Sequence, residues 1–255
     1  MKRSMALGAA VLALGAGGAA LVQKATAGGA VAQAGGGLSV MPAIIEHGPQ
    51  AGALTTLTVA NRSATPLAVT VTPRPWTQST SGKVSPNRRA TLPGVSVSQS
   101  TFTLAPGAEQ QVNATLSSAP SAGYLYGALE VIGVPTDAAT RKGVVLGYRL
   151  VGALRILPTT PKYGLTAANV KAVKGTAVIP VKNAGNTLDP VSGTVSVKGA
   201  RGTKNLAIAA VKILPGKSVN VPAGTKLAAG SYSAKVTLSQ RGKKALSVTK
   251  KFRVK

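Results

Sequence analysis

The sequence predicts an all-β fold, in which two tandem immunoglobulin-like β-sandwich domains follow a signal peptide. Three observations lead to this prediction. Apolar residues alternate with a period of two in many short segments, 30 glycines and 16 prolines provide the turns between them, and several short motifs occur twice. No segment carries a convincing amphipathic helical pattern.

The repeated motifs divide the chain into two similar halves. Each motif of the first half recurs about 110 residues later, which is the length of a tandem domain and not of a solenoid unit. The pairs are 57–61 (LTVAN) with 179–183 (IPVKN), 102–107 (FTLAPG) with 211–216 (VKILPG), and 121–126 (SAGYLY) with 228–233 (AAGSYS). We therefore expect one sandwich over residues 38–158 and a second over residues 159–255.

The N-terminal segment has the pattern of a secretory signal peptide. Lys2 and Arg3 precede an apolar run over residues 5–22, and small residues then offer cleavage sites near 27 and 34. We expect a signal peptide over residues 1–27, with cleavage as late as 34 as the alternative. A segment kept as a membrane anchor is the competing interpretation.

Between residues 38 and 157 the alternating segments are separated by Gly- and Pro-containing turns. A long polar stretch, 73–94, interrupts them. The expected strand regions are 38–45, 53–61, 67–72, 95–104, 109–116, 124–131 and 144–157.

The segment 144–157 is the longest alternating one, and it ends at Pro158 before a linker-like stretch. Apolar residues or glycine occupy one face along its whole length, and the other face carries Arg149 and Arg155. We expect one unusually long strand that closes the first domain.

Charge is distributed unevenly between the two halves. Residues 38–158 have a net charge of +5, whereas residues 159–255 hold 18 basic residues and one acidic residue, a net charge of +17. A body of this charge attracts polyanions such as anionic lipid or wall polymer. The alternative is that the charge only serves solubility.

The inventory of reactive side chains argues against an enzyme. There is no cysteine, the single histidine (His47) precedes a turn, and no carboxylate lies in a motif that pairs an acid with a base; the carboxylates are Glu46, Glu109, Glu130, Asp137 and Asp189. We therefore predict no catalytic site, no cofactor and no metal site. Nucleic acid is not expected as a partner, because the lysines of the second half have almost no aromatic residues between them.

The first domain resembles two groups of bacterial immunoglobulin-like proteins. The residues that carry the resemblance are 39–42 (SVMP), 57–67 (LTVANRSATPL), 102–107 (FTLAPG) and 120–124 (PSAGY). One group is the N-terminal domain of PapD-like pilus chaperones, and the other is the peptidoglycan-binding domain of WxL-interacting proteins. The resemblance covers residues 38–158 only.

The resemblance to pilus chaperones implies a specific mechanism. In that family the last strand of the first domain donates alternating apolar residues to a pilus subunit, while basic residues on the first and last strands hold the carboxylate of the subunit. This chain has no basic residue in 38–45. The candidate partner-binding residues are Leu146, Tyr148, Arg149, Leu150, Leu154 and Arg155; the alternative is that 144–157 is an ordinary core strand.

We predict a non-catalytic, secreted protein of a bacterial envelope, located outside the cell, at its surface or in the periplasm. Its partner would be an anionic envelope polymer or another surface protein, with peripheral membrane contact as a further option. The alternative function is a periplasmic-type chaperone for pilus or other surface subunits that acts by donor-strand complementation. A third hypothesis is an adhesin or structural module of a larger surface complex.

Overall fold

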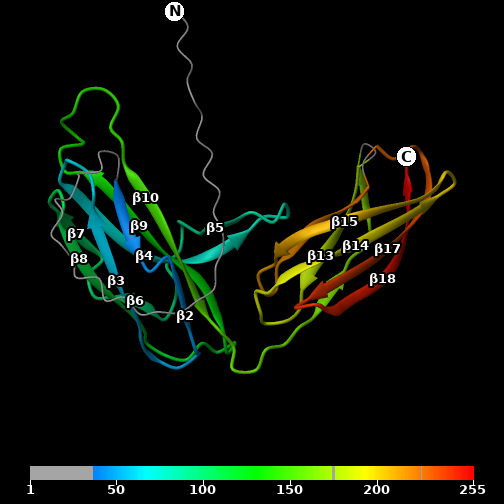
Figure 1. Ribbon diagram of the computed structural model, residues 1–255, viewed down its shortest axis with the longest axis horizontal. Coiled ribbons are helices and arrows are strands. Elements are labelled where there is room, and N and C mark those ends of the chain that lie inside the picture. Colours follow the sequence, from blue (N-terminus) through cyan, green and yellow to red (C-terminus); the bar gives the residue numbers. More distant parts are fainter. Residues whose placement is uncertain (1–36, 174–175, 225) are drawn as a thin grey trace, which may run out of the picture. The chain divides into compact units, whose positions relative to one another are not determined.

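The computed structural model describes residues 37–173, 176–224 and 226–255, so the predicted signal peptide lies outside the described residues. Within these ranges every regular element is a β-strand, which confirms the all-β prediction. In Figure 1 the strands of the first sandwich run from blue to green and those of the second from yellow to red. The described part of the chain contains no helix that is long and apolar enough to cross a membrane.

Two sheets form the first sandwich. One sheet has the order β1-β3-β8-β6, and the other has the order β2-β10-β9-β4-β5 with β7 also paired to β4. The bounds are β1 Leu38–Met41, β2 Ile44–His47, β3 Gly52–Asn61, β4 Leu67–Gln78, β5 Val84–Pro86, β6 Val95–Val97, β7 Thr101–Leu104, β8 Glu109–Leu116, β9 Leu125–Pro135 and β10 Tyr148–Ile156.

The first predicted strand region, 38–45, is in fact two strands that belong to different sheets. β1 pairs antiparallel with β3, the chain bends at Pro42, and β2 then pairs parallel with β10. Proline has no amide hydrogen and interrupts a ladder, so the bend falls where the chain changes sheets.

The predicted polar stretch 73–94 also contains more strand than the sequence suggested. β4 continues through Pro73 and Pro75 to Gln78 and folds back as β5. The amide groups of Leu92 and Asn87 donate to the carbonyl groups of Pro73 and Pro75 on the side away from β9. On this side of β4 the two prolines only accept hydrogen bonds through their carbonyl groups, so their lack of an amide hydrogen breaks no pairing.

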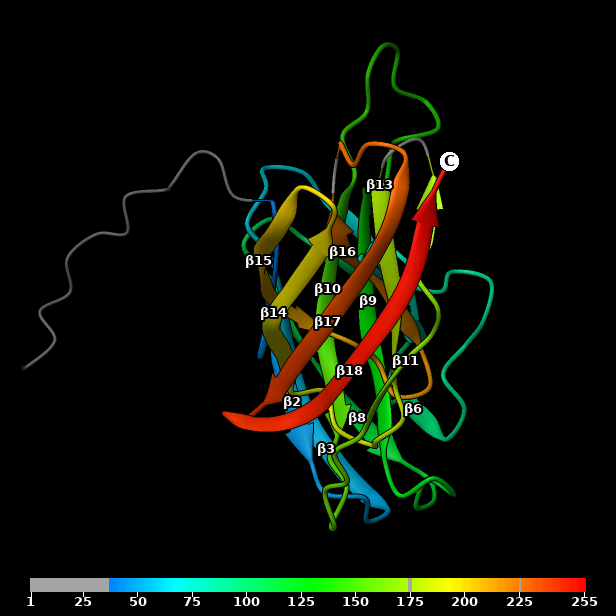
Figure 2. The ribbon, with the colours of Figure 1, turned by 90° about the vertical axis from the view of Figure 1, so that its right-hand side faces the viewer.

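The second sandwich consists of two further sheets. In one, β11 and β12 pair with one edge of β13, and β16 pairs with the other. The second sheet has the order β15-β14-β17-β18, which Figure 2 shows with the four strands side by side. The bounds are β11 Leu165–Ala167, β12 Lys171–Val173, β13 Thr176–Asn183, β14 Pro190–Gly199, β15 Gly202–Lys212, β16 Ser218–Gly224, β17 Gly230–Gln240 and β18 Lys243–Val254.

Each sandwich has a core of aliphatic side chains from its facing sheets, as the low aromatic content predicts. In the first sandwich Leu57, Leu129 and Leu154 are fully buried, and in the second Ile179, Val195 and Leu238 are. Complete burial of one such side chain contributes roughly 1.5–3 kcal/mol.

A buried asparagine closes β3 in the first sandwich. The Asn61 side-chain amide donates to the carbonyl groups of Thr65 and Leu104 at 2.8 and 3.0 Å, and its Oδ1 accepts from the Ser63 amide at 2.9 Å. Its backbone groups bond to Gly107 and Ala108 in the turn of the FTLAPG motif. This one residue therefore ties the end of β3 to two turns.

The second sandwich repeats this arrangement at Asn183. Its side-chain amide donates to Thr187 and Ile213 at 2.8 and 2.7 Å, and its Oδ1 accepts from the Gly185 amide at 2.9 Å. The repeated sequence motifs thus mark a repeated hydrogen-bond arrangement, because LTVAN and IPVKN both end in the buried asparagine.

Replacing Asn183 by alanine is expected to destabilise the protein by about 2–4 kcal/mol, because buried carbonyl groups lose their donors. Urea denaturation followed by circular dichroism measures the loss. Asn113→Ala, at an exposed position in β8, is the control and should change stability by less than about 0.5 kcal/mol. Equal effects of the two substitutions would contradict the role given to Asn183.

Candidate partner-binding strand

The candidate strand, β10, pairs with β9 along its whole length on one side and with β2 along only half of its length on the other. All of Tyr148–Ile156 pairs antiparallel with β9, but only Ala153–Ile156 pairs with β2. β2 starts at Ile44, after the bend at Pro42, and therefore reaches only the second half of β10.

The first half of β10 consequently presents backbone groups that lack a strand partner. The Ala153 amide donates to Ala43 and the Leu157 amide donates to His47, both at 2.8 Å, so odd-numbered residues face the β2 edge. Alternation places the backbone groups of Arg149 and Val151 on the same edge. Among the described residues no strand pairs with this edge over Tyr148–Gly152, which we call the open half-edge.

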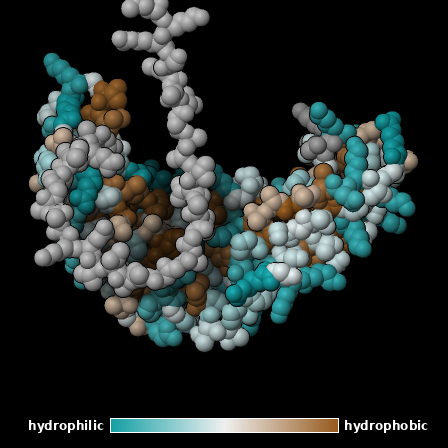
Figure 3. Space-filling model, in the orientation of Figure 1, coloured by the Kyte–Doolittle hydropathy of each residue, from teal (hydrophilic) through white to brown (hydrophobic). Residues whose placement is uncertain are grey.

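Apolar side chains of the alternating face become more exposed toward the start of the predicted strand. Val144 is 92% exposed and Leu146 is 72% exposed, whereas Tyr148 and Leu150 are half-buried and Leu154 is fully buried. Val144 and Leu146 belong to the loop between β9 and β10. Figure 3 shows hydrophobic surface on this loop. Exposed apolar groups of this kind mark interaction sites.

The prediction of one strand over 144–157 is wrong at its beginning. The strand begins at Tyr148, opposite Gly133, and β9 continues only to Pro135, where the chain enters turns closed by hydrogen bonds to Pro135 and Asp137. Gly147 and Leu146 lie opposite Val134 and Pro135 at the end of β9 but do not pair with them, whereas Val144 and Val145 lie beyond that end. The apolar alternation of the segment nevertheless continues that of β10.

Leu154 does not belong to the accessible part of the candidate site. Its side chain is fully buried in the core together with Leu57 and Leu129. This agrees with the alternative that the second half of the segment is an ordinary core strand. Leu146, Tyr148 and Leu150 remain candidates for contact with a partner.

The two candidate arginines are both held by carboxylates of the chain itself. Arg155 Nη1 lies 2.7 Å from Glu46 Oε1, on the neighbouring strand β2. Arg149 Nε donates to Glu130 Oε1 at 2.6 Å, on the neighbouring strand β9. Both arginine side chains are therefore already paired with a carboxylate of this chain.

Glu130 is the centre of a buried ionic cluster on the outer face of β9. Its side chain is 1% exposed, and Arg74 Nε reaches Oε2 at 3.2 Å while Arg88 Nε lies 3.7 Å from Oε1. Burial alone raises the pKa of this carboxyl, but the hydrogen bond from Arg149 and the charges of the arginines lower the pKa by more, to a value below its ordinary one.

The cluster fixes the sheet that carries the open half-edge. Arg74 comes from β4 and Arg149 from β10, so Glu130 joins both neighbours of the central strand β9. Sequence reasoning recorded Glu130 only as an isolated carboxylate. The position of Glu130 inside the alternating segment 124–131 could have indicated the cluster, because a charged side chain buried in a central strand requires an oppositely charged partner.

The described residues contain no group of three or more histidine, cysteine, aspartate or glutamate side chains that could hold a metal ion. The geometry at β10 offers backbone hydrogen bonds and apolar side chains. Such an arrangement is suited to adding a strand from another protein.

Comparison with known proteins bears on the fold. No protein-family model matches this chain, and no match was found among curated proteins. A chain in the structure of the chaperone–tip adhesin complex of CFA/I fimbriae matches with a TM-score of 0.53 and 14% identity, covering 84% of this chain and 99% of that chain. The class 5 fimbriae chaperone CfaA matches with a TM-score of 0.50 and 15% identity, covering 84% of this chain and 98% of that chain.

The fold is that of fimbrial chaperones. This likeness confirms the immunoglobulin-like sandwich and the resemblance to the PapD-like group that the motifs of residues 38–158 predicted. At such low identity the likeness concerns the fold alone.

Replacing Glu130 by glutamine is expected to cost about 2 kcal/mol at pH 7, because three arginines lose their counter-charge. The folded-state pKa is depressed, so the stabilisation is complete above the ordinary glutamate pKa and is lost as pH falls through the folded-state value. The stability of E130Q should therefore decline less than that of the unsubstituted protein as the solution is acidified.

Urea denaturation between pH 2 and about pH 7 measures both effects. Glu109→Gln is the control, since the ion pair of Glu109 with Arg62 is half-exposed and such pairs contribute less than about 1 kcal/mol. An E130Q protein as stable as E109Q at neutral pH would contradict a structural role for the cluster.

Proposed function

We propose that this protein is a non-catalytic chaperone of the periplasmic type, which holds a secreted surface subunit by adding a strand of that subunit to β10. The observation that carries the proposal is the open half-edge, next to which Val144 and Leu146 expose an apolar row. The fold, shared with the fimbriae chaperone CfaA, supports it.

The client strand would form hydrogen bonds with the backbone groups of Arg149 and Val151. Because these bonds involve only main-chain atoms, they would contribute affinity whatever the sequence of the client strand. The row formed by Val144, Leu146, Tyr148 and Leu150 would cover apolar surface of the client. Residues 144–147 already alternate correctly, so pairing with a client would extend β10 toward its start. The fully buried Leu154 takes no part.

Recognition of a client carboxylate by the last strand is not part of the proposal. The family pattern requires a basic residue on the first strand, and residues 38–45 have none. Arg149 and Arg155 are already bonded to Glu130 and Glu46. We infer that strand addition and apolar contacts provide the binding.

The chaperone hypothesis is favoured over an envelope-polymer protein, because the structural likeness is to a fimbriae chaperone. As such a chaperone the protein would act in the periplasm of a bacterium, and its partner would be a secreted surface protein that has not yet been assembled.

The test is co-expression of the full chain with each secreted protein encoded by adjacent genes. We expect one of them to form an equimolar complex that survives gel filtration. The double substitution Val144→Asp and Leu146→Asp should reduce the amount of bound subunit more than about tenfold, because it places charges in the apolar contact. Its stability should change by less than about 0.5 kcal/mol, since both side chains are exposed.

Two further variants complete the design. Val84→Asp alters an exposed apolar residue in β5 and should leave binding unchanged. Leu154→Asp buries an unpaired charge and should unfold the first sandwich, with a large fall in melting temperature. Undiminished binding by the Val144/Leu146 variant would refute the proposal, and so would the absence of any complex with the neighbouring secreted proteins.

A further inference from the structure

A cationic cavity lies at one end of the second sandwich. It is formed by the β14–β15 turn and by the segment that leads into β17, and its volume is about 190 Å³. Since one water molecule occupies about 30 Å³ of the liquid, the cavity has room for a small hydrated anion or a phosphate group.

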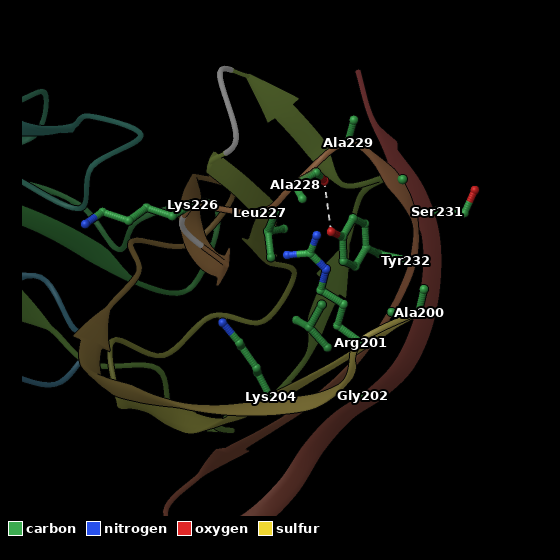
Figure 4. A pocket seen from close by; sticks show the side chains of 13 residues that line it. Ala200, Arg201, Gly202, Lys204, Lys226, Leu227, Ala228, Ala229, Ser231 and Tyr232 are labelled. Carbon is green, nitrogen blue, oxygen red and sulfur yellow. Dashed lines mark hydrogen bonds between the residues drawn. The ribbon is translucent and has the colours of Figure 1, made fainter.

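Three basic side chains line this cavity: Arg201, Lys204 and Lys226. Figure 4 shows the Arg201 guanidinium beside the Tyr232 ring and Leu227, with Lys204 extending toward the same space. Lys226 lies on the other side of Leu227, and its ammonium group points away from Arg201 in this view.

Among the described residues, no Asp or Glu side chain lines the cavity beside these cations. Asp189, the one acidic residue of 159–255, precedes β14, whereas the cavity lies at the other end of that strand, beside Gly199. Uncompensated cations around a concave surface create a strong positive potential.

The wall of the cavity is held in place by Tyr232. Its hydroxyl group donates to the Ala228 carbonyl at 2.8 Å, and its ring stacks on Phe252 at a centroid distance of 5.4 Å. A Cβ added at Gly199 would lie 2.5 Å from the Tyr232 ring, so the turn packs closely on this ring. Packing thus fixes the wall of the cavity against which the Arg201 guanidinium lies.

A second hollow adjoins the first on the other side of the same tyrosine. It shares Gly199, Ser231 and Tyr232 with the cavity and is lined by three more basic side chains, Lys198, Lys251 and Arg253. We call these six side chains and the two hollows the basic end. Lys198, Lys251 and Arg253 project from β14 and β18, two strands that both neighbour β17.

We propose that the basic end binds an anion carrying at least two phosphate groups, one in the cavity of Arg201 and Lys204 and another in the hollow of Lys251 and Arg253. Guanidinium groups match phosphate oxygens in a two-pronged geometry, and lysines add point charges. Two adjoining sets of cations, Arg201 with Lys204 and Lys198 with Lys251 and Arg253, favour a multiply phosphorylated ligand over a single carboxylate. This inference is independent of the chaperone function.

Phosphate groups of this kind come from two sources, the head groups of anionic lipids and soluble phosphate polymers. The probes are inorganic phosphate, tripolyphosphate and vesicles of phosphatidylglycerol or phosphatidylcholine, each titrated into the full chain by calorimetry at about 0.15 M salt, where exposed charges are screened beyond about 8 Å. We expect tripolyphosphate to bind at least about tenfold more tightly than phosphate, because its three linked phosphate groups carry more charge and can contact more of the basic side chains.

The decisive variant is Arg201→Gln with Lys204→Gln. We expect it to weaken tripolyphosphate binding about tenfold or more, because two charge-assisted contacts are lost. The matched control is Lys243→Gln with Lys244→Gln, which removes the same charge at the β17–β18 turn, at the far end of β17. Both pairs are exposed, so both variants should keep the melting temperature of the unsubstituted protein.

Binding of tripolyphosphate that falls in the first variant and persists in the control supports the basic end as a phosphate site. If phosphatidylglycerol vesicles bind with the same dependence and tripolyphosphate does not, the site is supported and its ligand is a lipid surface. Equal weakening by both variants would overturn the proposal, because net charge would then explain binding. So would the failure of both tripolyphosphate and phosphatidylglycerol to bind.

Discussion

The division of the first strand between two sheets determines what the first sandwich offers to a partner. β1 ends at Met41 in one sheet, and β2 begins at Ile44 in the other, where it pairs with only half of β10. A strand edge without a partner is normally a liability, because it invites association with other chains. Here the unpaired part adjoins the exposed apolar side chains of Val144 and Leu146, and the two features together form the proposed site for an added strand.

Such a site requires a rigid sheet behind it. Glu130 supplies this rigidity by bonding to Arg74 on β4 and Arg149 on β10, across the central strand β9. The same contact occupies Arg149, so the proposed partner contact uses backbone and apolar groups. The fully buried Leu154 fixes the second half of β10 in the core, so the fixed half and the accessible half of one strand have different roles.

The parts that the sequence predicted are those encoded by local patterns. Alternation and repeated turn motifs predicted the sandwiches, and LTVAN and IPVKN placed Asn61 and Asn183 equivalently. The partners of Glu130 were not predictable, since Arg74 lies 56 residues away in sequence and pairs only through sheet topology. The start of β10 was missed for a similar reason: alternation continues through Val144, but a strand also needs a neighbour, and β9 reaches only to Pro135, which lies opposite Leu146.

The most direct test of the account is amide hydrogen exchange along β10 in the full chain, with and without a bound client subunit. In the free chain the amides of Arg149 and Val151 should exchange faster than that of Ala153, which is bonded to Ala43. Client binding should slow Arg149 and Val151 to the rate of Ala153. The account would be contradicted if these two amides were already as protected as Ala153 in the free chain, or if the client left their exchange unchanged.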